Sequence, residues 1–66
     1  MLDTTFTTPE EGIEKLKKAV NIRNQMGSAL YFNICEDECL KLADKLSAAG
    51  VDKNLIASIG GWELKS

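Results

Sequence analysis

Residues 54–65 read NLIASIGGWELK, and the conformation of this stretch decides the fold class of the chain. Gly60-Gly61 has the composition of a two-residue turn that joins the strands of a β-hairpin. In that register Ile59 pairs with Trp62, and an apolar face lies opposite a mostly polar one. We favour this hairpin because it also gives the residues after the glycines a partner.

The same stretch also fits a short helix, which is the alternative interpretation. Asp52 would be the N-cap of this helix, and Gly60 would end it. Leu55, Ile56 and Ile59 share one side of such a helix. The chain would then be a three-helix bundle, so the two interpretations predict different fold classes.

Residues 35–49 carry the clearest periodic pattern and predict a helix. Its apolar positions recur every three or four residues and form one stripe: Cys35, Cys39, Leu42, Leu46 and Ala49. The acidic residues 36–38 would stand in the first turn, where negative charge favours the helix dipole. Gly50 is the expected left-handed residue after the helix, with Val51 packing back on Leu46 in a Schellman motif.

Residues 29–34 read ALYFNI and predict a β-strand. Leu30, Phe32 and Ile34 would point to one face, and the residues between them would point to the other. A run of this length, rich in aromatic and branched side chains, is typical of a half-buried strand.

An amphipathic helix is predicted for residues 9–26. Thr8 is placed to cap it, a proline suits its first position, and Glu11 completes a capping box with Thr8. Gly27 is expected to take the left-handed conformation that ends the helix. Phe6, just ahead of the cap, is expected to fold back on the apolar face of the helix.

We therefore predict an α+β fold, with residues 1–66 as a single small domain. Two amphipathic helices would pack on a small, mainly antiparallel sheet, which holds the strand at 29–34 and the hairpin around Gly60-Gly61. The alternative is a three-helix, all-α bundle. The expected core consists of Phe6, Ile13, Leu16, Val20, Leu30, Phe32, Ile34, Cys39, Leu42, Leu46, Leu55, Ala57, Ile59, Trp62 and Leu64.

Size and composition narrow the function classes. The chain has 66 residues, 44% of them hydrophobic, and a formal net charge of -2. A chain of this size buries only about 60% of its unfolded surface, so association with a second chain is a common source of stability. The composition argues against a disordered chain and against a strongly basic nucleic-acid binder. The absence of histidine removes the commonest general base and nitrogen ligand.

Cys35 and Cys39 are the only cysteines, and their i, i+4 spacing places both thiols on one side of a helix. Packing in the core is the favoured interpretation, because free cysteine is among the most buried residue types. The alternative is half of a zinc site that the same pair in a second chain completes, which would give a metal-linked dimer. No cofactor is expected.

A basic bias of the first helix supports a second function class, a small nucleic-acid-binding transcriptional regulator. The bias comes from Lys15, Lys17, Lys18 and Arg23. The glutamates of the same predicted helix and the negative net charge argue against this function class. Residues 40–59 would follow the order of a helix-turn-helix if the last segment is helical, but Lys53 is the only basic residue of that second helix. We therefore do not expect a nucleic-acid partner.

The leading hypothesis is a small non-enzymatic protein that binds a protein partner or a second copy of itself. Its role would be regulatory or inhibitory, a role compatible with a phage- or mobile-element-encoded gene. The candidate contact residues are Ile22, Tyr31 and Ile56, because the predicted fold leaves these apolar side chains off the main core. Such a surface is a more plausible use of the chain than a catalytic pocket, which usually needs several hundred Å3.

The sequence contains no apolar run of the roughly 20 residues that a membrane-spanning helix needs. Its start lacks the basic and apolar parts of a signal peptide. We therefore expect a cytoplasmic protein whose thiols stay reduced.

Overall fold

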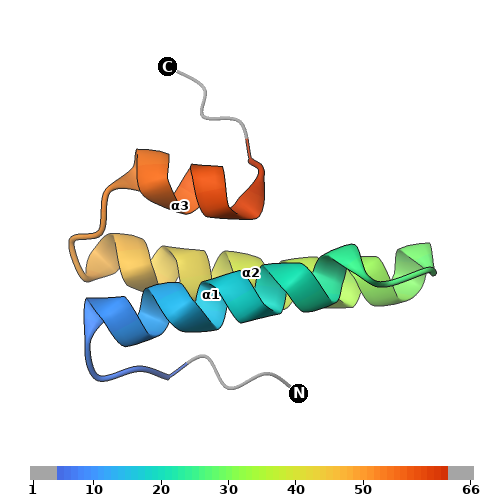
Figure 1. Cartoon of the computed structure of the whole chain (residues 1–66), viewed down its shortest axis with the longest axis horizontal. Helices are drawn as coiled ribbons and strands as arrows, with labels where there is room; N and C mark the ends of the chain where they lie inside the picture. Colours follow the sequence, from blue (N-terminus) through green and yellow to red (C-terminus); the bar gives the residue numbers. More distant parts are fainter. Residues whose placement is uncertain (1–4, 63–66) are drawn as a thin grey trace.

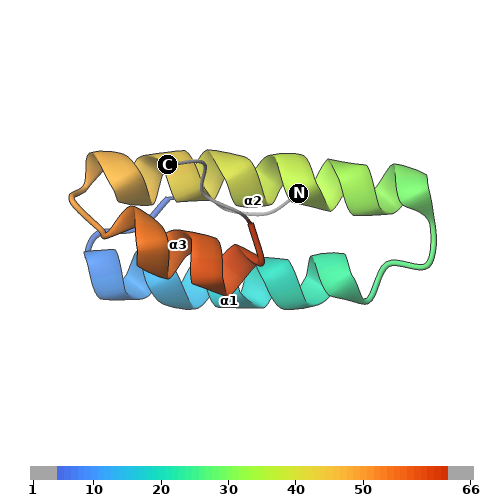
Figure 2. The same ribbon diagram turned by 90° about the horizontal axis from the view of Figure 1, so that it is seen from above.

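The computed structural model describes residues 5–62, which form three α-helices and no strand. α1 spans Pro9–Asn24, α2 spans Ala29–Ala48 and α3 spans Lys53–Gly60. α1 and α2 form an antiparallel hairpin, and α3 lies along one half of it (Figures 1 and 2). The predicted α+β fold is therefore wrong, and the three-helix alternative describes the chain.

The segment predicted as a strand, residues 29–34, forms the first turns of α2. Helical spacing turns Phe32 toward the protein, in series with the fully buried Cys39, while Leu30 and Ile34 face outward. The alternation that predicts a strand therefore combines residues of both sides of the helix, with Leu30 and Ile34 outside and Phe32 inside. Packing against α1 over a long helix outweighs the local β preference of this short segment.

Gly60-Gly61 is not a hairpin turn, because the two glycines serve different purposes at the end of α3. Gly60 is helical, and a Cβ atom on it would lie 2.3 Å from ring atoms of Trp62. Only glycine therefore lets the indole fold back against the helix. Gly61 has a φ of 72° and is the left-handed cap, beyond which the Trp62 N–H donates to the Ala57 carbonyl at 2.9 Å.

The predicted start signal of α1 is confirmed, and so is the N-cap Asp52 of the alternative, helical interpretation of the last segment. The Thr8 hydroxyl accepts the Glu11 N–H at 3.2 Å, and the Asp52 carboxylate accepts the Asn54 N–H at 2.9 Å. The capping box is modified, because the Glu11 carboxylate accepts a hydrogen bond from the Thr7 hydroxyl at 3.0 Å. Each cap satisfies a backbone donor that the helix itself leaves without a partner.

The helix endings agree with the sequence at α2 and differ at α1. Gly50 has a φ of 95°, and the Val51 N–H donates to the Leu46 carbonyl at 3.0 Å, which confirms the Schellman motif. The C-cap of α1 is Gln25 in the right-handed conformation. The prediction that Gly27 ends α1 with a left-handed residue is therefore wrong.

The three helices share one core, whose buried members are Leu16, Ala19, Val20, Cys39, Leu42, Ala43, Leu46 and Ile56. Partly buried side chains pack against it: Phe6, Ile13, Val51, Ile59 and Trp62. The predicted anchoring by Phe6 is confirmed. Gly12 makes this approach feasible, because a Cβ there would lie 2.5 Å from Leu46 Cδ2 and 3.0 Å from the Phe6 ring.

Three residues predicted to be in the core are exposed: Leu30 at 66%, Ile34 at 52% and Leu55 at 45%. Their burial was expected from strand pairing, and helical rotation turns them to the surface instead. Leu64, also predicted in the core, lies outside the described residues. Ile56 makes the opposite change and is buried where α3 meets α2.

The helices differ in length, which leaves one end of the molecule thinner. α3 has 8 residues and α2 has 20, so α3 covers only the half of the hairpin away from the α1–α2 loop (Figure 2). α2 begins at the uncovered end, where its N-cap Ser28 makes no side-chain capping hydrogen bond. Among the described residues, no helix combines the length and the apolar character that crossing a membrane requires.

Candidate functional site

Two of the three predicted contact residues lie near the α1–α2 loop. Ile22 is in the last turn of α1, and Tyr31 is in the first turn of α2. The antiparallel hairpin brings both turns to the same end of the molecule, which α3 does not reach (Figures 1 and 2). Ile22 is 38% exposed and Tyr31 is 59% exposed, so both side chains are open to a partner.

Leu30 and Ile34 add two more exposed apolar side chains to this end. We call Ile22, Leu30, Tyr31 and Ile34 the hairpin-end surface. Single exposed apolar residues are ordinary, whereas several at one place mark an interaction site. Sequence reasoning placed Leu30 and Ile34 in a sheet core. Extending the helical register of Cys39 back to Phe32 would have placed them on the outside.

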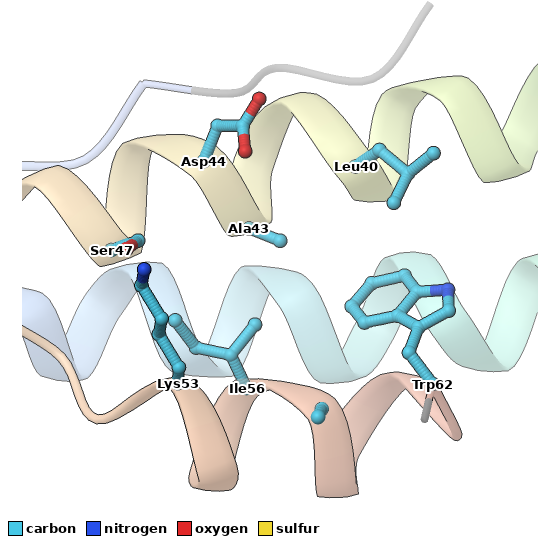
Figure 3. A pocket seen from close by; sticks show the side chains of 8 residues that line it. Leu40, Ala43, Asp44, Ser47, Lys53, Ile56 and Trp62 are labelled. Carbon is cyan, nitrogen blue, oxygen red and sulfur yellow. The ribbon is translucent and has the colours of Figure 1, made fainter. Parts of the chain in front are cut away.

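Ile56, the third predicted contact residue, has a different position. It is 5% exposed and belongs to the core, so the premise that it lies off the core is wrong. Its side chain points from α3 toward α2 and lines a groove between these helices (Figure 3). The structure therefore places Ile22 and Tyr31 at the same end of the molecule and Ile56 apart from them.

The groove between α2 and α3 has a volume of about 260 Å³. Its lining residues are Leu40, Ala43, Asp44, Ser47, Lys53, Ile56, Ala57 and Trp62. Trp62 stands at one end and Lys53 at the other, with Ile56 between them (Figure 3). The lining is mostly apolar, and the volume is below the roughly 300–1,000 Å³ of typical small-molecule sites. The polar side chains of its lining are those of Asp44, Ser47 and Lys53.

A polar cluster ties the three helices together beside this groove. Arg23 is 7% exposed, and its guanidinium donates to Glu36 Oε1 at 2.8 Å, to the Gly60 carbonyl at 3.0 Å and to Asn24 Oδ1 at 2.8 Å. Trp62 Nε1 donates to the same Glu36 oxygen at 3.2 Å. One carboxylate oxygen therefore links α1 and α2 to the residue that follows the cap of α3.

Aromatic rings flank the same guanidinium. The Arg23 Cζ atom lies 5.3 Å from the centroid of the Phe32 ring and 5.9 Å from that of Trp62, within cation–π range. The sequence counted Arg23 in a basic surface, which is wrong because the side chain is buried and paired. The overlooked signal is its position seven residues after Leu16, on the core side of α1.

Two of the remaining basic residues of α1 pair with glutamates of the same helix. Lys15 lies 3.8 Å from Glu11, and Lys17 lies 3.8 Å from Glu14. α3 runs along the other helices (Figures 1 and 2), whereas a helix-turn-helix crosses its helices at about 90–120°. Lys53 is also the only basic residue of α3. The arrangement does not favour nucleic-acid recognition.

The two cysteines are free and unequally accessible. Cys39 is fully buried, and this burial raises the pKa of its thiol although the positive charge of Arg23 opposes the shift. Cys35 is half-buried one turn earlier. Within residues 5–62, no group of three or more His, Cys, Asp and Glu side chains is placed to hold a metal. Cys39 thus packs in the core, as favoured by the sequence, and does not present its thiol to a second chain.

The acidic residues 36–38 do not stand in a first helical turn, because α2 begins at Ala29. Glu36 turns inward to Arg23, and Glu38 lies 3.8 Å from Lys41. The negative charges of Glu36 and Glu38 are therefore compensated by side chains, and the predicted role of residues 36–38 at a helix N-terminus is wrong.

Comparisons of the chain with protein-family models, with curated proteins and with solved structures found no match.

Proposed function

We propose that the chain is a small, non-enzymatic protein that binds another protein through the hairpin-end surface and so regulates or inhibits it. The observation that carries this proposal is the exposure of Leu30, Tyr31 and Ile34, which are 66%, 59% and 52% exposed within the first turns of one helix. Apolar and aromatic side chains gathered in this way are typical of protein interfaces.

The energetics favour a bound state for this surface. Burying an exposed leucine or isoleucine side chain contributes about 1.5–3 kcal/mol. Tyr31 combines a large apolar ring with a hydroxyl that can donate a hydrogen bond, which is why tyrosine is enriched among interface residues of high energetic weight. α3 is too short to supply these contacts within the chain.

Other features support the non-enzymatic and cytoplasmic parts of the proposal. The groove of about 260 Å³ is small and mostly apolar, and the sequence has no histidine to act as a general base. Cys35 and Cys39 are free thiols, as expected for a reducing compartment such as the cytoplasm.

Site-specific photo-crosslinking in the native cells tests the proposal. A photoreactive phenylalanine analogue replaces Tyr31 in one variant and the exposed Ser58 of α3 in a matched control. We expect a covalent adduct with a different protein at position 31, its absence at position 58, and its loss when Ile22→Ser is added. Equal adducts at both positions, or none at position 31, would contradict the proposed function.

A further inference from the structure

One side of α2 faces away from both other helices along its whole length. The residues on it recur every three or four positions, and all of them are exposed: Leu30, Ile34, Asp37, Lys41, Lys45 and Ala48. We call these six residues the outer α2 face. The opposite side of the helix carries Cys39, Leu42 and Leu46, which are buried in the core.

The outer α2 face changes character along the helix. Its N-terminal part is apolar, with Leu30 and Ile34, and Asp37 follows as its acidic residue. Its C-terminal part is basic, with Lys41 and Lys45. When two such faces pack antiparallel, the acidic position of one meets a basic position of the other, and lysine stems cover apolar side chains. The face is therefore complementary to an antiparallel copy of itself.

We propose that a second copy of this chain covers the outer α2 face, with the two α2 helices antiparallel about a two-fold axis. The proposal goes beyond the proposed function, because it assigns Leu30 and Ile34 to a contact between copies and leaves Ile22 and Tyr31 of the hairpin-end surface to the target. In this register Asp37 of each copy faces Lys41 of the other. Ile34 lies against the aliphatic stem of Lys45, and two-fold symmetry produces every contact twice.

Charge selects the antiparallel arrangement over the parallel one. Parallel helices in register would place Asp37 against Asp37 and Lys41 against Lys41, and Lys45 would also meet its own copy. Each of these contacts is repulsive. The antiparallel register replaces the first two by attractive pairs, and it brings the apolar N-terminal part of each face onto the long side chains of the other.

The dimension of α2 is sufficient for such a contact. Its 20 residues extend for about 30 Å, which is long enough for a two-helix interface. Ile22 belongs to α1, and Tyr31 is rotated away from the outer α2 face by the residue spacing of the helix. Both therefore remain accessible, and the dimer presents two copies of the remaining target-binding residues.

Sedimentation equilibrium of the full chain tests the dimer over a wide range of concentrations. We expect a reversible dimer for the unmodified chain. Asp37→Lys should raise its dissociation constant about tenfold, because two attractive pairs become repulsive. Asp37→Lys combined with Lys41→Glu should restore the dimer, because the exchanged charges again face their opposites. In a parallel pair the same exchange restores nothing.

Glu14→Lys is the matched control. It removes an intrahelical pair with Lys17, which is 3.8 Å away on α1, and should leave the dissociation constant unchanged. Circular dichroism establishes that each variant is folded. A chain that stays monomeric, or a dimer indifferent to Asp37→Lys, overturns the proposal. If the chain is monomeric and position 31 still forms an adduct with a different protein, the dimer is overturned and the proposed function is supported. If the chain dimerises but position 31 forms no such adduct, the dimer is supported and the proposed function is overturned.

Discussion

Arg23 and Glu36 form an ion pair of 2.8 Å between α1 and α2, with side chains that are 9% and 26% exposed. The pair also binds the end of α3 and the residue after its cap, because Arg23 donates to the Gly60 carbonyl and Glu36 accepts from Trp62 Nε1. No buried side-chain nitrogen or oxygen in the described part of the chain lacks a partner. One charged pair thus contacts the first two helices and the end of the third.

Arg23→Ala should lower the free energy of unfolding by about 3 kcal/mol, as measured by urea denaturation. The substitution leaves the carboxylate of Glu36 and the carbonyl of Gly60 without their cationic donor. Lys17→Ala, on the exposed side of α1, is the control and should change the free energy by less than about 0.5 kcal/mol. Equal losses of unfolding free energy in the two variants would show that the buried pair contributes no more to stability than an exposed lysine.

Gly60→Ala should destabilise the protein, although alanine is normally better than glycine in a helix by about 1 kcal/mol. The added Cβ would lie 2.3 Å from the Trp62 ring and would displace the indole from Glu36. We expect a lower melting temperature and a red-shifted tryptophan emission. Gly27→Ala is the control, because nothing lies within 4 Å of its Cβ position and its φ is not positive.

The helix boundaries show what the sequence could and could not predict. Thr8, Asp52 and Gly50 have side-chain or backbone requirements that act within a few residues, and their roles are confirmed. The segment 29–34 has no such local signal, because Ser28 caps α2 without a side-chain hydrogen bond. Its conformation depends on α1, which the local pattern does not contain.

In the candidate site, too, local sequence signals predict some residues, whereas others depend on distant parts of the chain. Ile22 and Tyr31 are identified because Ile22 departs from the apolar side of the predicted helix 9–26, and Tyr31 departs from the apolar face of the predicted strand 29–34. A strand at 29–34 does not predict the exposure of Leu30 and Ile34, since that exposure follows from helical rotation. Arg23 was misplaced because its partner Glu36 and its acceptor Gly60 are distant in sequence.

Removal of helix caps should have unequal effects. Thr8→Ala and Asp52→Ala each remove an observed side-chain acceptor of a backbone N–H, and each should cost about 1 kcal/mol. Ser28→Ala removes no such hydrogen bond and should cost clearly less. Thermal unfolding of the three variants measures the difference. A Ser28→Ala loss as large as the other two would contradict the capping geometry.

The stability of the protein should fall with rising pH above the ordinary thiol pKa of 9.0, in part because of Cys39. Burial raises the pKa of this thiol, so the unfolded chain ionises first and unfolding releases a proton. The stabilisation is complete below pH 9.0 and is lost as the pH rises toward the folded value. Urea denaturation at pH 8 and pH 10 should show a smaller pH effect for Cys39→Ser.

Cys35→Ser is the control for this experiment, because Cys35 is only half-buried. It should retain the pH dependence of the unmodified chain. A Cys39→Ser variant with the full pH dependence would show that the Cys39 thiol does not cause it.

Because α3 covers only half of the α1–α2 hairpin, the covered and uncovered halves should open at different free energies. Amide protons of α1 and α2 beneath α3 should exchange with solvent only through global unfolding, whereas those near residues 22–34 should exchange through fraying of the two-helix end. The apolar side chains of that end therefore sit on the part of the backbone that opens at the lowest free energy. Contact with a partner should slow this exchange first, and hydrogen-exchange rates would then map the interface onto the loop end of the molecule.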